Sequence, residues 1–134
     1  MSLKTFLDSG TLLSAWKPGE LHARAISILD DETRKFLTCE NVKLELLPKP
    51  TFEKRPSEVQ FYNEHFNQAT IEPFSAALGK AALELGEKWG LAAGDALNLA
   101  SAIRQGADEF ITSELPGKPM FRVKELKVIS LHSL

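Results

Sequence analysis

The sequence predicts an α/β fold, in which one domain has a central, mostly parallel sheet of four to five short strands flanked by helices. The main observation is that short β-rich runs alternate with longer segments of helical periodicity, which is typical of a parallel sheet with crossover helices. A length of 134 residues fits one domain, and an apolar content of 43% is enough for a core. We therefore expect one domain over residues 1–134.

The expected strands are short apolar runs next to turn residues. Strands are predicted at residues 5–7, 36–38, 110–112 and 128–131, with a brief edge strand at residues 69–72. The first strand is followed by Asp8-Ser9-Gly10, which favours a turn. Between the last two strands, Pro116, Gly117 and Pro119 predict a loop.

The expected helices have apolar residues at a spacing of three or four. They are predicted at residues 12–16, 20–35, 40–47, 57–67, 74–89 and 92–105. Ser57 and Gln60 match a capping box, residues 51–55 are expected to form a loop, and Gly90 suits a helix C-terminus. The segment 92–105 is apolar nearly all round, so we expect this helix to be central and buried.

Four acidic residues lie where these apolar runs end, namely Asp8, Glu45, Asp95 and Glu114. Open α/β folds place their ligands at the carboxyl ends of the strands. Carboxylates gathered there in apolar surroundings need a counter-charge to stay ionised, and a divalent metal is the usual one. The pattern therefore favours a metal-dependent nuclease.

Each acid also has a structural interpretation. Asp8 suits an Asx-turn or a helix N-cap, and Asp95 suits the positive end of a helix dipole. Glu45 suits the exposed face of an amphipathic helix, and Glu114 suits an exposed loop. Asp95 is the most informative of the four acids. Asp95, Asn98 and Ser101 follow one another at a spacing of three and form one polar stripe on an apolar helix.

Composition limits the location and the partners. A net charge of −2 gives no global attraction for nucleic acid, so binding of a polyanion needs a local basic patch or a metal. The single Cys39 excludes an internal disulfide and fits a reducing compartment. No signal peptide is visible, and no apolar run approaches the roughly 20 residues that span a bilayer. We expect a cytoplasmic protein without a membrane partner.

The segments TFLDSGTLLSA, FLTCENVKLELLPKP, GLAAGDALNLASAIRQGADEFITSE and LKVISL together resemble a PIN domain. The third segment is the most specific, since in the family an Asp opens a helix of the form DALxLAxA, followed by a Gly-Ala turn, a strand, a Thr and an acid. The four segments span the chain, so the resemblance covers one whole PIN domain. Many PIN domains are Mg²⁺- or Mn²⁺-dependent ribonucleases, including the VapC-type toxins of bacterial toxin–antitoxin pairs.

The resemblance implies a metal-dependent endoribonuclease with Mg²⁺ or Mn²⁺ as its cofactor. The catalytic and metal-binding acids of the family map onto Asp8, Glu45, Asp95 and Glu114. The side chains expected to support them by hydrogen bonds are Thr112, Ser113, Asn98 and Ser9. Two positions depart from the family, because the fourth acid is usually Asp and because the position of Gly10 is often polar.

The partners implied by the resemblance are an RNA substrate, an antitoxin protein and a second copy of the chain. Two sets of basic residues are candidates for phosphate contacts, with a solvated surface as the alternative: Lys43, Lys49, Lys54 and Arg55, and Lys118, Arg122, Lys124 and Lys127. Candidates for base stacking, or alternatively for packing, are Phe52, Phe61, Tyr62 and Phe66.

Two other functions compete with the ribonuclease. One is a catalytically weak or inactive PIN-like module that binds RNA or a protein, which Glu114 and the slightly acidic balance favour. The other is a phosphoacceptor domain, since small α/β receivers also gather acids at strand ends. Against the phosphoacceptor domain, the sequence has neither an acidic pair near its N-terminus nor a matching Lys after a late strand.

Overall fold

The computed structural model describes residues 2–134 and confirms the predicted α/β fold with a parallel sheet. Five strands hydrogen-bond in the order β3-β2-β1-β4-β5, and every neighbouring pair is parallel. The strands are β1 (Leu3–Leu7), β2 (Arg34–Cys39), β3 (Thr70–Glu72), β4 (Glu109–Thr112) and β5 (Lys127–Ser130). Because all strands run the same way, their carboxyl ends meet at one edge, where the acids were predicted.

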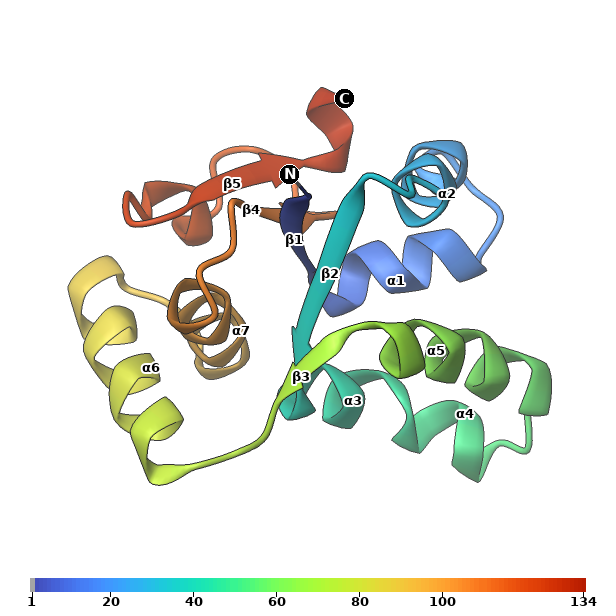
Figure 1. Cartoon of the computed structure of the whole chain (residues 1–134), viewed down its shortest axis with the longest axis horizontal. Coiled ribbons are helices and arrows are strands. Elements are labelled where there is room, and N and C mark those ends of the chain that lie inside the picture. The colour runs from blue at the N-terminus through green and yellow to red at the C-terminus, as the bar shows by residue number, and fades with distance from the viewer. Residues whose placement is uncertain (1) are drawn as a thin grey trace.

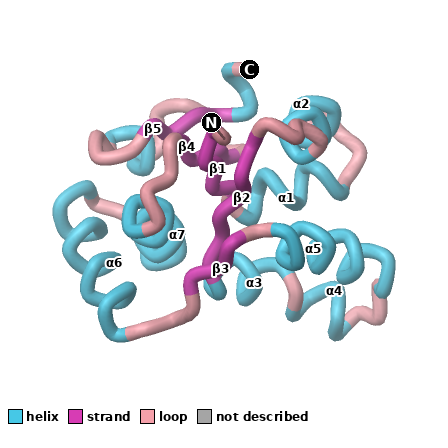
Figure 2. The backbone as a smooth tube through the Cα atoms, viewed as in Figure 1, coloured by secondary structure: helices cyan, strands magenta, loops and turns pink. Residues whose placement is uncertain are grey.

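Helices cover both faces of the sheet (Figures 1 and 2). In Figure 1, α6 and α7 lie on one side, while α1, α2 and α5 lie on the other and α3 and α4 lie beneath α5. The bounds are α1 (Ser9–Trp16), α2 (His22–Leu29), α3 (Glu40–Leu46), α4 (Pro48–Phe52), α5 (Pro56–Gln68), α6 (Ala76–Trp89) and α7 (Ala93–Arg104). Two short 3-10 helices, η1 (Pro119–Arg122) and η2 (Leu131–Ser133), flank β5.

The core lies between the central strands and the helices, as the apolar runs predict. Phe6 of β1 stacks on Phe110 of β4 with ring centroids 5.3 Å apart, and both rings are buried. Helix α7 contributes Leu99, Ala100 and Ala102 to the core, which confirms that this helix is central. Within residues 2–134, none of the helices is both long and apolar enough to cross a bilayer.

Several predicted boundaries are wrong. The helix predicted to reach residue 35 ends at Leu29, because the Asp31 carboxylate accepts hydrogen bonds from the backbone and hydroxyl of Thr33 and turns the chain into β2. Residues 51–52, predicted as part of a loop, form the end of α4. The capping box predicted at Ser57 is absent, since α5 begins at Pro56. Leu131 belongs to η2 rather than to a strand.

The opposite edge of the sheet holds a separate polar network. Arg34 pairs with Glu109 and donates to the Thr5 hydroxyl at 3.0 Å, while that hydroxyl donates to Glu109, also at 3.0 Å. Each of these groups therefore has a partner, as buried polar groups require. This network joins the amino ends of β2 and β4 to the middle of β1 and leaves the carboxyl edge for other chemistry.

Candidate metal centre

Asp8 is held in place by the junction between β1 and α1. It is the N-cap of α1: its Oδ1 accepts from the Thr11 backbone N–H at 2.9 Å, and its Oδ2 accepts from the Thr112 hydroxyl at 2.5 Å. The side chain is only 8% exposed, and burial raises the pKa of its carboxyl to about 6 against the lowering effect of these hydrogen bonds. The capping interpretation is therefore correct, and it leaves a buried carboxylate at the candidate site.

The turn after β4 connects Asp8 to Glu114. The Thr112 hydroxyl that donates to Asp8 accepts from the Glu114 backbone N–H at 3.1 Å, and Glu114 itself is exposed. Gly10 makes room for this turn, because a Cβ at Gly10 would lie 2.1 Å from the Ser113 Oγ. The absence of a side chain at Gly10 thus allows α1 and the turn to approach closely.

Asp95 and Glu45 approach each other from two helices. Asp95 is half-buried in the first turn of α7, and Glu45 projects from α3 with an exposed side chain. Gly94 leaves room for the Glu45 carboxylate beside α7, because a Cβ there would lie 3.1 Å from Glu45 Oε2. The Glu45 carboxylate also accepts from Asn98 Nδ2 at 2.9 Å, so α7 holds Glu45 directly.

The electrostatics at this edge are unbalanced. Burial, followed by the negative charges of Glu114 and Glu45, raises the pKa of Asp95, and Asp95 in turn contributes to the raised pKa of Asp8. Within residues 2–134, the ion pairs between side chains involve none of these four acids. The acids are therefore close enough to repel one another, and none of them is neutralised by an ion pair with a basic side chain of residues 2–134.

The four carboxylates do not converge on one point as they lie. No group of three His, Cys, Asp or Glu side chains in the part of the chain that the structure describes is arranged to hold a metal ion. The donor chemistry nevertheless fits Mg²⁺ or Mn²⁺, which favour carboxylate oxygens and retain waters in their coordination. The raised pKa values of Asp8 and Asp95 are the observation that supports such an ion, because a divalent charge would stabilise both ionised forms.

The four predicted supporting side chains behave differently. Asn98 donates to Glu45 and Thr112 donates to Asp8, whereas Ser9 and Ser113 make no side-chain hydrogen bond within the described residues. Sequence reasoning missed three further residues that hold the acids or their partners, namely Thr11, Asn41 and Cys39. Thr11 carried a signal, since it is the third residue after an N-cap Asp, and the other two carried none.

A hollow of about 240 Å³ adjoins Glu45. Its basic side chains come from Lys17, Lys49 and Arg55. Arg55 is already paired, because its guanidinium lies 3.2 Å from Glu53 and 3.4 Å from the buried Glu58. Lys17 and Lys49 have no ion-pair partner within residues 2–134, so these two ammonium groups are available to an anion beside Glu45.

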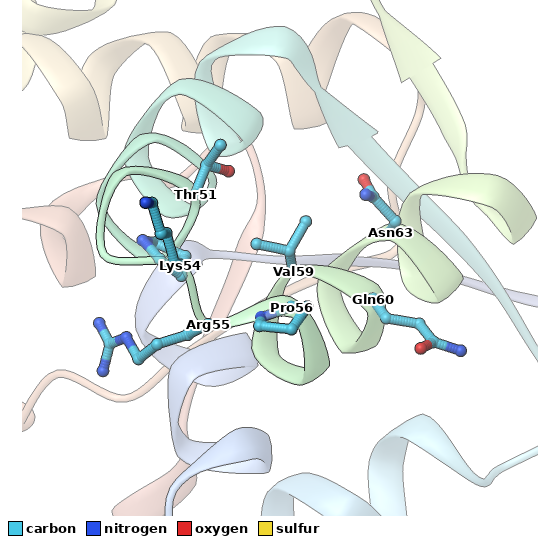
Figure 3. Close-up of a pocket in the computed structure, with 8 residues that line it drawn as sticks. Thr51, Lys54, Arg55, Pro56, Val59, Gln60 and Asn63 are labelled. Carbon is cyan, nitrogen blue, oxygen red and sulfur yellow. The ribbon is translucent and has the colours of Figure 1, made fainter.

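A larger hollow of about 610 Å³ lies between α4 and α5 (Figure 3). Its lining is mainly the apolar surface of Pro50, Pro56 and Val59 with the stem of Lys54, and it contains none of the four acids. Arg55 lines this hollow as well as the one beside Glu45. The α4–α5 hairpin therefore separates an apolar hollow from the acidic edge.

The aromatic candidates for base stacking are mostly core residues. Tyr62 is fully buried, and Phe66 is 3% exposed under the Lys43 ammonium. Phe61 packs on Trp16 with ring centroids 5.5 Å apart. Phe52, which is 88% exposed at the end of α4, is the one of the four that is free to contact a partner.

A parallel α/β sheet with uncompensated carboxylates at its carboxyl edge defines a small α/β domain with a candidate divalent-cation site. The PIN domain family matches the chain over residues 5–114. The chain therefore belongs to the PIN domain family, as its motifs suggest. A comparison with curated protein sequences gave no significant match.

Solved structures of the same fold include toxin–antitoxin proteins. VapBC2 from Rickettsia felis, bound to a promoter DNA fragment, matches with a TM-score of 0.72 at 18% identity, covering 96% of this chain and 98% of that one. A toxin–antitoxin complex from Klebsiella pneumoniae gives 0.71 at 16%, covering 95% and 97%. Mycobacterium tuberculosis VapC20, a toxin that cleaves the sarcin–ricin loop, gives 0.64 at 16%, covering 92% and 98%. At these identities the likeness shows the fold.

Proposed function

We propose that the protein is a Mg²⁺- or Mn²⁺-dependent endoribonuclease. The observation that carries this proposal is the buried Asp8 carboxylate, whose pKa is raised to about 6 in part by Asp95, while Asp95 in turn is affected by Glu45 and Glu114, and none of the four acids has an ion-pair partner within residues 2–134. Such a site is costly for a folded protein unless it binds a cation. Membership of the PIN family supports the same activity.

Asp8 and Asp95 are the proposed metal ligands, with Glu45 and Glu114 as ligands directly or through water. When bound, the ion would lower the pKa of a water molecule and neutralise charge on a phosphodiester. Asp8 is the most firmly fixed of the four, because Thr11 and Thr112 each donate to one of its oxygens. The exposed carboxylates of Glu45 and Glu114 have more freedom to adjust.

The proposed reaction is hydrolysis of a phosphodiester. The oxygen of water forms a bond to phosphorus, one ester P–O bond breaks, and the released oxygen takes up a proton. Glu45 is the proposed residue that orients the attacking water, because its exposed carboxylate can accept a hydrogen bond from it while Asn98 Nδ2 holds one of the two oxygens.

The RNA backbone is proposed to pass over the hollow beside Glu45. Lys17 and Lys49 line this hollow and have no acidic partner within residues 2–134, so their ammonium groups can contact phosphates on the strand being cut. Glu53 and Glu58 line the same hollow, but both are paired with Arg55. Their repulsion of a phosphate is therefore partly neutralised. Phe52 is the proposed aromatic contact to an unpaired base or to a protein.

The protein is further proposed to be the toxin of a toxin–antitoxin pair that acts in the cytoplasm. The structural neighbour from Klebsiella pneumoniae is a toxin–antitoxin complex, which supports an antitoxin partner. A homodimer is proposed through the apolar surface of α3 and α4, where a shallow hollow of about 620 Å³ is lined by exposed apolar groups. These groups include Leu44, Phe52 and Phe74.

A non-catalytic PIN module is the second candidate function. The observation that favours it is that the four carboxylates do not converge on a single cation position within residues 2–134. In that case the exposed apolar surface around Phe52 would serve a protein partner, and the acids would be a remnant of the fold.

The two candidates differ in metal-dependent cleavage. Purified protein should be incubated with a mixed RNA pool and Mg²⁺ or Mn²⁺, beside Asp95→Asn and the control Asp30→Asn, which removes an exposed acid at the end of α2. Cleavage that needs the metal and Asp95 but not Asp30 supports the ribonuclease. Equal cleavage by wild type and Asp95→Asn would refute this assignment of the site.

A further inference from the structure

We propose that Asn41 is a positioning residue that fixes the side-chain amide of Asn98 and thereby holds Glu45 against α7. This inference rests on the proposed function for its catalytic meaning, because Glu45 matters only if the acidic edge binds a metal. The geometry itself is independent of any activity. It depends on three buried side chains from β2, α3 and α7 that meet behind Glu45.

Asn41 lies in the first turn of α3 and is 5% exposed. Its Nδ2 donates to Asn98 Oδ1 at 3.0 Å and makes a longer contact of 3.5 Å with the backbone oxygen of Gly94. Gly94 directly precedes Asp95. Asn41 therefore reaches from the helix that carries Glu45 to the turn of α7 that carries Asp95.

The orientation of the Asn98 amide follows from its partners. Asn98 is 2% exposed, and its Oδ1 accepts from Asn41 and, at 3.4 Å, from the Cys39 thiol. With its oxygen facing two donors, the amide presents Nδ2 to Glu45 Oε1 at 2.9 Å. The flipped amide would place its oxygen against a carboxylate and its N–H groups against the donors, and both contacts would be unfavourable.

The functional consequence is a fixed distance between the carboxylates of Glu45 on α3 and Asp95 on α7. Glu45 has a long, exposed side chain that would otherwise sample several rotamers, and ordering such a side chain has an entropic cost. Asn98 removes part of this freedom, and Asn41 ensures that Asn98 presents a donor. Residues that orient metal-binding groups in this way change metal affinity about 10- to 100-fold when they are replaced.

The test uses Asn41→Leu, Asn98→Leu and the double variant, with Mn²⁺ as the probe. Leu is close to Asn in size and suits a buried helical position, but it has no donor. We expect Asn41→Leu to weaken Mn²⁺ affinity on the order of tenfold. Because Asn41 acts through Asn98, we expect the double variant to bind Mn²⁺ no more weakly than Asn98→Leu alone.

A second measurement requires no metal. In the wild type, the Nδ2 protons of Asn98 should exchange slowly with solvent by NMR, because they are buried and bonded to Glu45. In Asn41→Leu this exchange should become at least tenfold faster. The matched control is Thr5→Val, which removes buried hydrogen bonds at the opposite edge of the sheet and should leave both the exchange of Asn98 and the Mn²⁺ affinity unchanged.

Each outcome decides the proposal. Additive losses in the double variant, or an Asn98 amide that exchanges as slowly in Asn41→Leu as in wild type, would overturn it. An equal loss of Mn²⁺ affinity in Asn41→Leu and in the control Thr5→Val would also overturn it. The weaker binding would then result from a general loss of stability. The positioning role stands, and the ribonuclease fails, if the predicted Mn²⁺ and exchange results appear while the wild type cuts no RNA. If the wild type binds no Mn²⁺, the exchange measurement alone decides the positioning role.

Discussion

Replacing Asp8 with Asn should stabilise the metal-free protein at neutral pH. In the folded chain, burial raises the pKa of Asp8 from its ordinary 3.8 to about 6. The folded state therefore holds this proton more tightly than the unfolded state, so ionising Asp8 destabilises the fold. This penalty is absent below pH 3.8, grows between pH 3.8 and about 6, and is complete at higher pH. The amide side chain of the Asp8→Asn variant cannot ionise, so the variant avoids this penalty.

The expected size follows from the pKa. A pKa that rises from 3.8 to about 6, at about 1.4 kcal/mol per pKa unit, corresponds to about 3 kcal/mol at pH 7.5. Urea unfolding of wild type and Asp8→Asn should be measured from pH 3.5 to pH 7.5. The hydrogen bonds of Asp8 to Thr11 and Thr112 are already included in its folded-state pKa, and the difference in hydrogen bonding between Asn and protonated Asp8 adds an offset that does not depend on pH, so the informative quantity is the change in the stability difference between these two pH values.

Metal should nearly cancel the stability difference between the wild type and Asp8→Asn. Mn²⁺ at 100 times its dissociation constant should stabilise the wild type by about 2.7 kcal/mol and should leave Asp8→Asn nearly unchanged. A stability difference between wild type and variant that stays constant over pH 3.5–7.5 would refute the argument, because Asp8 would then have the same pKa in both states. Equal stabilisation of the two proteins by Mn²⁺ would refute its role as a ligand.

Three further predictions concern residues around this site and the helix next to it. Thr112→Val removes the donor to Asp8 Oδ2, so the pKa of Asp8 should rise further and Mn²⁺ titrations should show binding shifted to higher pH. In Gly10→Ala the Ser113 hydroxyl, which the new Cβ would approach to 2.1 Å, must rotate away, so urea unfolding should show less than the gain of about 1 kcal/mol that Ala has over Gly in a helix, and Gly10→Ala made in a Ser113→Ala background should recover that gain. Gly90→Ala should cost about 1 kcal/mol in the same assay, since Gly90 has a φ of 69°.

Sequence reasoning predicted most of the fold because local signals agree with tertiary packing. The apolar runs of β1 and β4 and the stripe on α7 required no knowledge of their neighbours. The predictions failed where a single polar contact or a proline decided the local conformation. The helix predicted to reach residue 35 ends early because Asp31 accepts a hydrogen bond from Thr33. Helix α5 begins at Pro56, where Ser57 was expected to be the cap. Such competition between side chain and backbone is invisible to periodicity.

The candidate site was predictable only in part. The positions of Asp8 and Asp95 follow from strand ends and helix starts, which the sequence marks clearly. The contacts of Asn41 and Cys39 with Asn98 depend on how α3 and the end of β2 pack on α7, and no spacing along the chain indicates that packing. The same is true of Gly10, whose missing side chain is explained only by the approach of Ser113.

The acids at this edge are held by neutral donors, and this choice has a physical consequence. Thr112 and Asn98 orient Asp8 and Glu45 without adding positive charge, whereas the network at the opposite edge uses Arg34 to neutralise Glu109. A positive charge in place of either donor would relieve the repulsion between the acids, and it would also compete with a divalent cation for the same oxygens. The chain therefore keeps a net negative charge at one edge of its sheet at the expense of its own stability. Stability lost in this way is regained only by a ligand that supplies the missing charge, so a variant that neutralises Asp8 or Asp95 and leaves the neutral donors in place should lose affinity for a divalent cation while its metal-free form gains stability at neutral pH.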